Sequence, residues 1–265
     1  MDNPADPAPR FIDVGAGAAA RRIAVRARSG ASPGIVWLGG FNSDMKGTKA
    51  TALDRWAAEH GRALVRFDYS GHGESGGAMA EGTIGRWLED SLAVFDACCE
   101  GPQVVVGSSM GGWLALLMAR ELMRRTTPAR RASLAAMVLI APAPDFTEEL
   151  MWKQMAPDIR ATIERDGVWR MPSAYDEQPY LITRALIEDG RRHLVLGGPI
   201  ETGCPVRILQ GVKDPDVPWR HAFALTARLP SDDVVLTLIQ DGDHRLSRPQ
   251  DIARILAAVA EFALA

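Results

Sequence analysis

The sequence has 265 residues, of which 47% are hydrophobic and 24% charged, and its formal net charge is −3. This composition is ordinary for a globular protein, and the length suffices to bury one large hydrophobic core. The small negative charge gives no electrostatic reason to expect nucleic acid or an anionic membrane as a partner.

The cysteines and the N-terminal segment restrict compartment and cofactors. The three cysteines, Cys98, Cys99 and Cys204, cannot form a disulfide framework, and no Cys or His spacing resembles a zinc site. The N-terminal MDNPADPAPRF lacks the apolar core of a secretory signal and the arginine-rich character of a transit peptide. No apolar run approaches the roughly 18 residues of a membrane span. We expect a cytoplasmic protein without metal or other cofactor.

Short β-like runs alternate with segments of helical periodicity. The expected strands are 11–15, 22–28, 35–38, 63–69, 104–106, 137–141, 206–210 and 234–240. The expected helices are 48–60, 83–98, 111–125, 219–229 and 250–264. The glycine-rich turn between the first two strands predicts an antiparallel hairpin. The later strands are separated by helix-length segments, which predicts a mainly parallel eight-stranded sheet with helices on both faces.

The alternation is interrupted between residues 143 and 203. This stretch is too long for a plain connection, and it is rich in Met, Trp and Tyr. We predict a small helical cap inserted into a single domain of residues 1–265. Trp152 and Met155 are candidate substrate contacts, since adaptable methionine side chains suit an acyl chain. The alternative is that these side chains form the cap's own small core.

The sharpest local signal is Gly107-Ser108-Ser109-Met110-Gly111, which has the pattern G-x-S-x-G. It lies between a buried strand and an apolar helix, where a tight turn exposes the serine hydroxyl at the edge of the sheet. The N-terminus of the following helix favours developing negative charge. Ser109 is the expected nucleophile, because only Ser109, and not Ser108, has both glycines in register. A plain glycine-rich turn is the alternative.

A serine hydroxyl needs a base, and the base needs an orienting acid. In an arrangement of this kind the acid and then the histidine follow the serine, each at the end of a later strand. Asp214 follows the strand 206–210, and His244 follows the strand 234–240. His244 is the only one of the five histidines at such a position after the acid. Asp216 remains the alternative acid.

Acyl transfer also needs hydrogen-bond donors for the oxyanion. The backbone N–H of Met110 is one candidate, and Phe41, in the loop after the strand 35–38, supplies the other. Asn42 and Lys46 lie on the same loop and are candidate substrate contacts.

The turn-rich segment 68–75 contains His72 and Glu74. We interpret that segment as a structural loop, with a metal or acid/base pair as the alternative.

These residues together resemble the α/β-hydrolase superfamily across nearly the whole chain. The resemblance rests on WLGGFNSDMKGTKA, RFDYSGHGES, VVVGSSMGGWLALLMA, GVKDPDVPW and DGDHRLS. It is strongest to the branch that contains a mitochondrial palmitoyl-protein thioesterase, also an acyl-glucuronide esterase, and its bacterial relatives. The departures are Gly39, where many members have histidine, and the missing mitochondrial presequence, which suits a bacterial protein.

The resemblance implies an α/β-hydrolase fold and a serine hydrolase in which Ser109, Asp214 and His244 form the triad and Phe41 and Met110 the oxyanion hole. It implies small-molecule acyl ester or thioester substrates, either S-acylated thiols or acyl glucuronides. The same triad also serves acyl transfer to an alcohol, peptide hydrolysis and carbon–carbon bond cleavage. A non-catalytic ligand-binding protein on this scaffold is the alternative from another class.

Overall fold

The computed structural model describes residues 6–125, 131–172, 179–230 and 233–264. Its centre is an eight-stranded sheet in the order β1-β2-β4-β3-β5-β6-β9-β10. The strands are β1 (Arg10–Val14), β2 (Arg21–Arg28), β3 (Ala31–Leu38), β4 (Arg62–Phe67), β5 (Gly101–Ser108), β6 (Ala132–Ile140), β9 (Val206–Gly211) and β10 (Val234–Ile239). β2 pairs antiparallel with β1 and β4, and every pairing from β4 to β10 is parallel. The predicted hairpin and the mainly parallel sheet are confirmed.

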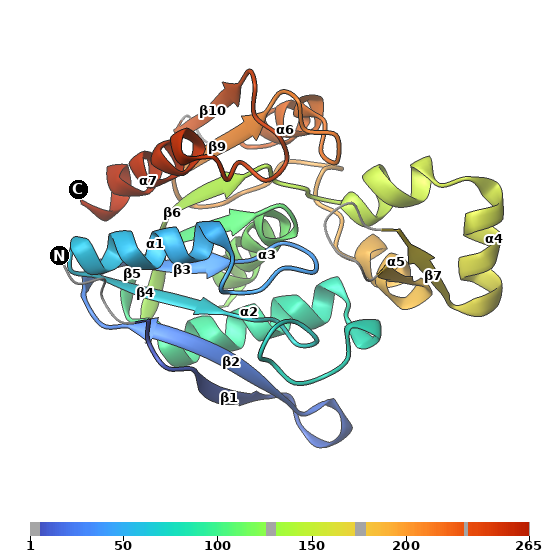
Figure 1. Cartoon of the computed structure of the whole chain (residues 1–265), viewed down its shortest axis with the longest axis horizontal. Coiled ribbons are helices and arrows are strands. Elements are labelled where there is room, and N and C mark those ends of the chain that lie inside the picture. Colours follow the sequence, from blue (N-terminus) through green and yellow to red (C-terminus); the bar gives the residue numbers. More distant parts are fainter. Residues whose placement is uncertain (1–5, 126–130, 173–178, 231–232, 265) are drawn as a thin grey trace.

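Helices cover both faces of this sheet (Figure 1). The helices that flank it are α1 (Thr48–Glu59), α2 (Ile84–Cys98), α3 (Met110–Arg124), α6 (Trp219–Thr226) and α7 (Pro249–Ala263). One buried cluster joins α1 and α7 to one face, and a larger cluster joins α2, α3 and α6 to the other. Parallel strands that are buried on both faces consist of apolar runs. Such runs are visible in the sequence, so the strands could be predicted.

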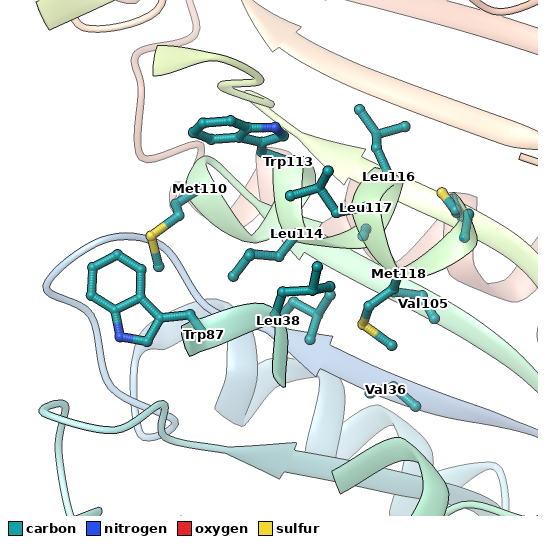
Figure 2. Close-up of a cluster of buried hydrophobic side chains, with 14 of the residues drawn as sticks. Val36, Leu38, Trp87, Val105, Met110, Trp113, Leu114, Leu116, Leu117 and Met118 are labelled. Carbon is teal, nitrogen blue, oxygen red and sulfur yellow. The ribbon is translucent and has the colours of Figure 1, made fainter. Parts of the chain in front are cut away.

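The larger cluster surrounds α3, which is apolar on nearly every side. Figure 2 shows Leu114 and Met118 of α3 in one buried cluster with Leu38 of β3 and Val105 of β5. Trp87 and Trp113 are fully buried in the same cluster. A helix that is hydrophobic all round belongs in a core. This packing fixes the N-terminus of α3, and therefore Ser109, relative to the sheet.

Two central strands begin several residues earlier than their apolar runs predicted. β3 starts at Ala31 rather than at residue 35, and β6 starts at Ala132 rather than at 137. The first residues of β3 are exposed or half-buried, whereas its last five are buried. In these two strands the apolar run marks only the part that ends in the core, because the less buried part keeps its ladder hydrogen bonds whatever its side chains are.

The cap segment (residues 143–203) lies between β6 and β9 and projects to one side of the sheet (Figure 1). Its elements are η3 (Thr147–Met151), η4 (Trp152–Gln154), α4 (Pro157–Asp166), β7 (Val168–Met171), β8 (Tyr180–Thr183) and α5 (Arg184–Arg191). Beside the helices that the sequence predicted, it contains the antiparallel pair β7–β8, which the sequence did not predict. Strands of four residues are too short to show a clear alternation of polar and apolar residues.

Within the ranges described above, no helix has the length and apolar character needed to cross a membrane.

Candidate active site

Ser109 stands at the sharp turn between β5 and α3. Its backbone has φ 53° and ψ −116°, a strained conformation for a residue with a side chain. Gly107 and Gly111 make the turn sterically feasible: a Cβ on Gly111 would lie 2.1 Å from the carbonyl oxygen of Leu38, and one on Gly107 would lie 2.4 Å from that of Gly111. This is the geometry of a nucleophile elbow. It places the Ser109 hydroxyl at the edge of the sheet, at the N-terminus of α3.

Three side chains form a hydrogen-bonded chain at this point. His244 Nε2 lies 3.1 Å from Ser109 Oγ, and His244 Nδ1 lies 2.8 Å from Asp214 Oδ2. A carboxylate can only accept, so the proton of the neutral imidazole is on Nδ1 and Nε2 is free to accept from the serine hydroxyl. The geometry is that required of a nucleophile, a base and an orienting acid.

The carboxylate of Asp214 is held rigidly. Its side chain is fully buried. Oδ1 accepts the backbone N–H groups of Asp216 (2.9 Å) and Val217 (2.8 Å), and Oδ2 also accepts Gln210 Nε2 (3.1 Å). Asp216, the alternative acid, thus contributes its backbone to the same carboxylate that bonds to His244. Sequence reasoning missed Gln210, although a buried amide at the end of an apolar strand was a visible signal.

Asp214, Asp216 and His244 also offer ligand atoms that all lie within 4.8 Å of one another. Such a cluster could in principle hold a cation. However, the Asp214 carboxylate already accepts four hydrogen bonds, one from His244 Nδ1 and three from Gln210 Nε2 and the backbone N–H groups of Asp216 and Val217. This donor set fits an orienting acid better than a metal ligand.

A cavity of about 560 Å³ opens over Ser109. The apolar part of its lining, called the apolar wall below, comes largely from cap residues and from the loop after β3: Phe41, Met110, Phe146, Leu150, Met151, Met171 and Tyr180. The polar part of the lining, called the polar wall below, comprises Asn42, Ser43, Asp44, Thr48, Lys49, Asp216, Arg245 and Ser247. The volume is typical of a small-molecule site. The two walls are suited to a substrate with one apolar and one polar end.

Both expected oxyanion donors border this cavity together with Ser109. Met110 is the first residue of α3 and is fully buried. Phe41 follows Gly40, where a Cβ would lie 3.5 Å from that of Ser109, so the loop runs directly beside Ser109. The Phe41 ring meets those of Trp87 and Phe146 at centroid distances of 5.9 and 6.0 Å.

Of the four residues expected to contact substrate, only Asn42 lines the cavity. The Lys46 ammonium pairs with Glu74 at 2.7 Å. Trp152 and Met155 pack on the small apolar cluster inside the cap segment, which includes Ile163, and not in the cavity wall formed by the described residues. Their placement matches the alternative of a cap core.

Lys49 and Arg245 are cavity residues that the sequence analysis did not select. Lys49 Nζ donates to the backbone carbonyl of Arg245 at 2.5 Å. Burial, with a smaller contribution from the charge of Arg245, lowers the pKa of Lys49 to about 8. The signals were Lys49, the second lysine of FNSDMKGTKA, which lies in the first turn of α1, and the arginine directly after His244.

The comparisons with known proteins agree with this geometry. The model of the family described as "Alpha/beta hydrolase family" matches residues 8–255. The chain belongs to the α/β hydrolases. As an α/β hydrolase it is 37% identical over 241 residues to the human palmitoyl-protein thioesterase ABHD10, mitochondrial, an alignment that covers 91% of this chain and 76% of the relative. The bovine protein of the same name is 38% identical over 241 residues, and the alignment again covers 91% of this chain and 76% of the relative.

Solved structures place this α/β hydrolase in the same group. A crystal structure of a hydrolase from Agrobacterium vitis S4 is 50% identical, with a TM-score of 0.94 and coverage of 97% of this chain and 98% of that one. Mouse α/β hydrolase domain-containing protein 10 is 34% identical, with a TM-score of 0.84 and coverage of 96% and 97%. The predicted family is confirmed. This α/β hydrolase is an enzyme of the hydrolase class, and its thioesterase relatives support ester or thioester hydrolysis.

Proposed function

We propose that this α/β hydrolase cleaves carboxylic esters or thioesters through an acyl-Ser109 intermediate. The observation that supports the proposal best is the continuous chain of hydrogen bonds from Ser109 Oγ through His244 to the buried Asp214 carboxylate, set in a cavity. The relatives named palmitoyl-protein thioesterase act on an acyl thioester, which supports the same reaction class.

In the proposed acylation, Ser109 Oγ attacks the acyl carbonyl carbon while its proton moves to His244 Nε2. The carbonyl π electrons move onto oxygen, and the oxyanion accepts hydrogen bonds from the Met110 and Phe41 N–H groups. As the tetrahedral intermediate collapses, the proton passes from His244 to the departing alcohol or thiol. Asp214 holds the imidazole tautomer and stabilises the imidazolium throughout.

In the proposed deacylation, His244 takes a proton from water, and the resulting hydroxide equivalent attacks the acyl carbon. The second tetrahedral intermediate expels Ser109 Oγ, which regains the proton, and the carboxylic acid leaves. Water is the only co-reactant, so no cofactor is needed. Acyl transfer to an alcohol would follow if an alcohol replaced water at this step.

The two walls of the cavity orient the substrate in this proposal. His244 must protonate the leaving atom, so the leaving group lies on the side of His244, where Arg245, Ser247 and Lys49 form the polar wall. The acyl chain then lies against the apolar wall supplied by the cap segment, which covers the site as part of a single domain. S-acylated thiols and acyl glucuronides both have this division into an apolar acyl part and a polar leaving part.

The cellular setting is part of the same proposal. The sequence favours a cytoplasmic protein of bacterial origin, whereas the mammalian relatives have "mitochondrial" in their names. Both the compartment and the origin stay predictions. A small-molecule acyl substrate is the only partner that the proposal requires.

Hydrolysis of p-nitrophenyl esters from acetate to decanoate, together with a palmitoyl thioester, tests the proposal. Wild type should hydrolyse members of the series, and Ser109→Ala should lower kcat at least about 10⁴-fold. Ser108→Ala is the matched control and should keep kcat within about threefold, because its hydroxyl is not the one that contacts His244. If wild type is inactive on every substrate and a fluorophosphonate fails to label Ser109, the ligand-binding alternative replaces the proposal.

A further inference from the structure

The oxyanion-side loop (residues 39–45) is attached to a second loop (residues 68–75) that the sequence left without a functional role. The loops follow β3 and β4 and lie at the same end of the sheet (Figure 1). Three hydrogen bonds join them: Tyr69 Oη to Gly39 O at 3.2 Å, Asn42 N to His72 Nε2 at 3.1 Å, and Met45 N to Asp68 Oδ1 at 2.6 Å. Both ends and the middle of the oxyanion-side loop are therefore held from outside.

The middle bond depends on a histidine that is arranged to accept. His72 is 4% exposed, and its ring meets those of Tyr69 and Trp87 nearly edge-on. Nδ1 faces the carbonyl oxygen of Ser70 at 3.3 Å. A carbonyl only accepts, so Nδ1 bears the proton and Nε2 presents its lone pair to the Asn42 N–H. Burial lowers the pKa of His72 to about 4, so this neutral tautomer persists through the neutral pH range.

The interpretation of His72 and Glu74 as a metal or acid/base pair finds no support in their contacts. The Glu74 carboxylate pairs with Arg26 at 3.0 Å and with Lys46 at 2.7 Å, at the surface. The His72 ring instead bonds to backbone groups on both of its nitrogens. Each residue thus has partners of its own, and those of His72 include the oxyanion-side loop.

The residue held by His72 has an unusual backbone. Asn42 has φ 58°, a left-handed conformation that non-glycine residues rarely adopt and that persists where surrounding contacts impose it. The N–H accepted by His72 belongs to the peptide unit that joins Phe41 to Asn42. The Phe41 N–H belongs to the preceding unit, whose neighbour at Gly39 is held by Tyr69 Oη. With the backbone held on both sides, the rotations φ and ψ at Phe41 are restricted, and so is the direction in which the Phe41 N–H points.

We propose that His72 is a positioning residue for hydrolysis: by accepting the Asn42 N–H, its Nε2 aims the Phe41 N–H at the oxyanion that forms on the acyl group of Ser109. The role rests on the proposed function. His72 touches neither the substrate nor the triad. Because the oxyanion forms only during the reaction, the contribution of His72 falls on kcat and not on substrate binding.

A matched pair of substitutions separates this role from packing. Glutamine places an amide oxygen near the position of Nε2 and can accept the Asn42 N–H. Methionine has nearly the same length and shape but only a weak acceptor. Steady-state kinetics of His72→Gln and His72→Met on one p-nitrophenyl ester give kcat and KM. Active sites are counted with a fluorophosphonate, so that misfolded enzyme does not lower the apparent kcat. The inhibition constant of an alkylboronic acid, which forms a tetrahedral adduct on the serine, reports the oxyanion hole directly.

We expect His72→Met to lower kcat per active site between about 10- and 100-fold, because loss of a whole oxyanion donor costs about 10²–10³-fold. KM should change less than about twofold, and the boronic acid should bind weaker by a factor close to the loss of kcat. His72→Gln should recover most of kcat and of boronic acid affinity. Tyr69→Phe, which removes the bond to Gly39, should produce a smaller loss of the same kind.

Equal kcat values per active site for the methionine and glutamine variants would overturn the positioning role, whether both match wild type or both are equally reduced. A loss of kcat with unchanged boronic acid affinity would overturn it as well. Neither result would affect the proposed function as long as wild type hydrolyses the ester. If wild type neither hydrolyses esters nor binds the boronic acid, the proposed function fails, and the role of His72 fails with it.

Discussion

The ring of Phe41 meets the ring of Tyr180 edge-on, with centroids 5.8 Å apart and planes at 89°. Phe41 belongs to the loop beside Ser109, and Tyr180 begins β8 of the cap segment. The cap therefore contacts the residue whose N–H we propose as an oxyanion donor. Through this contact, the position of the cap and the shape of the acyl side of the cavity are linked.

Replacing Tyr180 tests that link. Tyr180→Ala removes an edge-to-face partner worth about 1 kcal/mol and part of the apolar wall, so we expect KM for p-nitrophenyl decanoate to rise about five- to tenfold. The acetyl group buries much less apolar surface than the decanoyl group, so KM for the acetate ester should change less than about twofold. Chain-length profiles of wild type and variant provide the measurement. Equal changes for acetate and decanoate would contradict the assignment of the apolar wall to the acyl chain.

The two candidate acids predict different kinetics. Asp214→Asn should lower kcat about 10⁴-fold, because an amide no longer enforces the required tautomer of His244. Asp216→Asn should stay within about threefold of wild type, since Asp216 supports Asp214 through its backbone N–H. Measuring kcat for both variants on one ester decides between them. A larger loss for Asp216→Asn would transfer the acid's role to Asp216.

Gln210 should contribute to catalysis through Asp214. Its amide donates to Asp214 Oδ2 and to the backbone carbonyl of Val217, and the side chain is fully buried. Gln210→Leu removes one of the hydrogen bonds that hold the carboxylate, so we expect kcat to fall about tenfold, which corresponds to the roughly 1.5 kcal/mol of a hydrogen bond to a charged group. Unchanged kcat with reduced thermal stability would show that Gln210 supports only the fold.

The lowered pKa of Lys49 predicts that the enzyme's preference for a charged leaving group depends on pH. This pKa is about 8, so the side chain is charged below pH 8 and mostly neutral above it. An ester with a carboxylate on its leaving group, such as an acyloxybenzoate, should be favoured over the corresponding methyl ester at pH 7 by about fivefold, the size of an exposed ion pair of about 1 kcal/mol. The preference should decline as the pH rises through 8.

Lys49→Met is the control for this profile, and its ratio of kcat/KM between the two esters should stay constant from pH 7 to 9.5. Taking the ratio cancels any pH dependence that both substrates share. A wild-type ratio that is flat over the same range would exclude Lys49 from recognition of the leaving group.

The cap segment should depend on Asp145 for its attachment. Asp145 is 2% exposed, and its carboxylate accepts the N–H groups of Val195 (2.8 Å) and Leu196 (2.9 Å), which joins the beginning of the cap to its end. Asp145→Asn replaces one acceptor with a donor and leaves a buried N–H unpaired, which costs about 1–3 kcal/mol. Calorimetry should show Tm lower by about 2–4 °C for each kcal/mol. The exposed Glu164→Gln in the same segment should shift Tm by less than about 1 °C.

That Ser109, Asp214 and His244 lie together could be predicted, because each follows an apolar strand and parallel strands bring those ends to one edge of the sheet. The sequence could not place Trp152 and Met155, since they lie in and just after the short turns η3 and η4, where no regular period shows which side faces the sheet. It also missed the bond between Asn42 and His72. That contact joins residues 30 apart along the chain and uses a backbone donor, which leaves no side-chain pattern.

The acyl-enzyme itself provides the most direct test of the central claim. Wild-type enzyme mixed with p-nitrophenyl decanoate, quenched in acid within milliseconds and digested, should yield a peptide whose mass is increased by one decanoyl group at Ser109. The same peptide from Ser109→Ala should be unmodified. Steady hydrolysis by wild type without any acylated Ser109, or with the acyl group on another residue, would contradict the proposed mechanism.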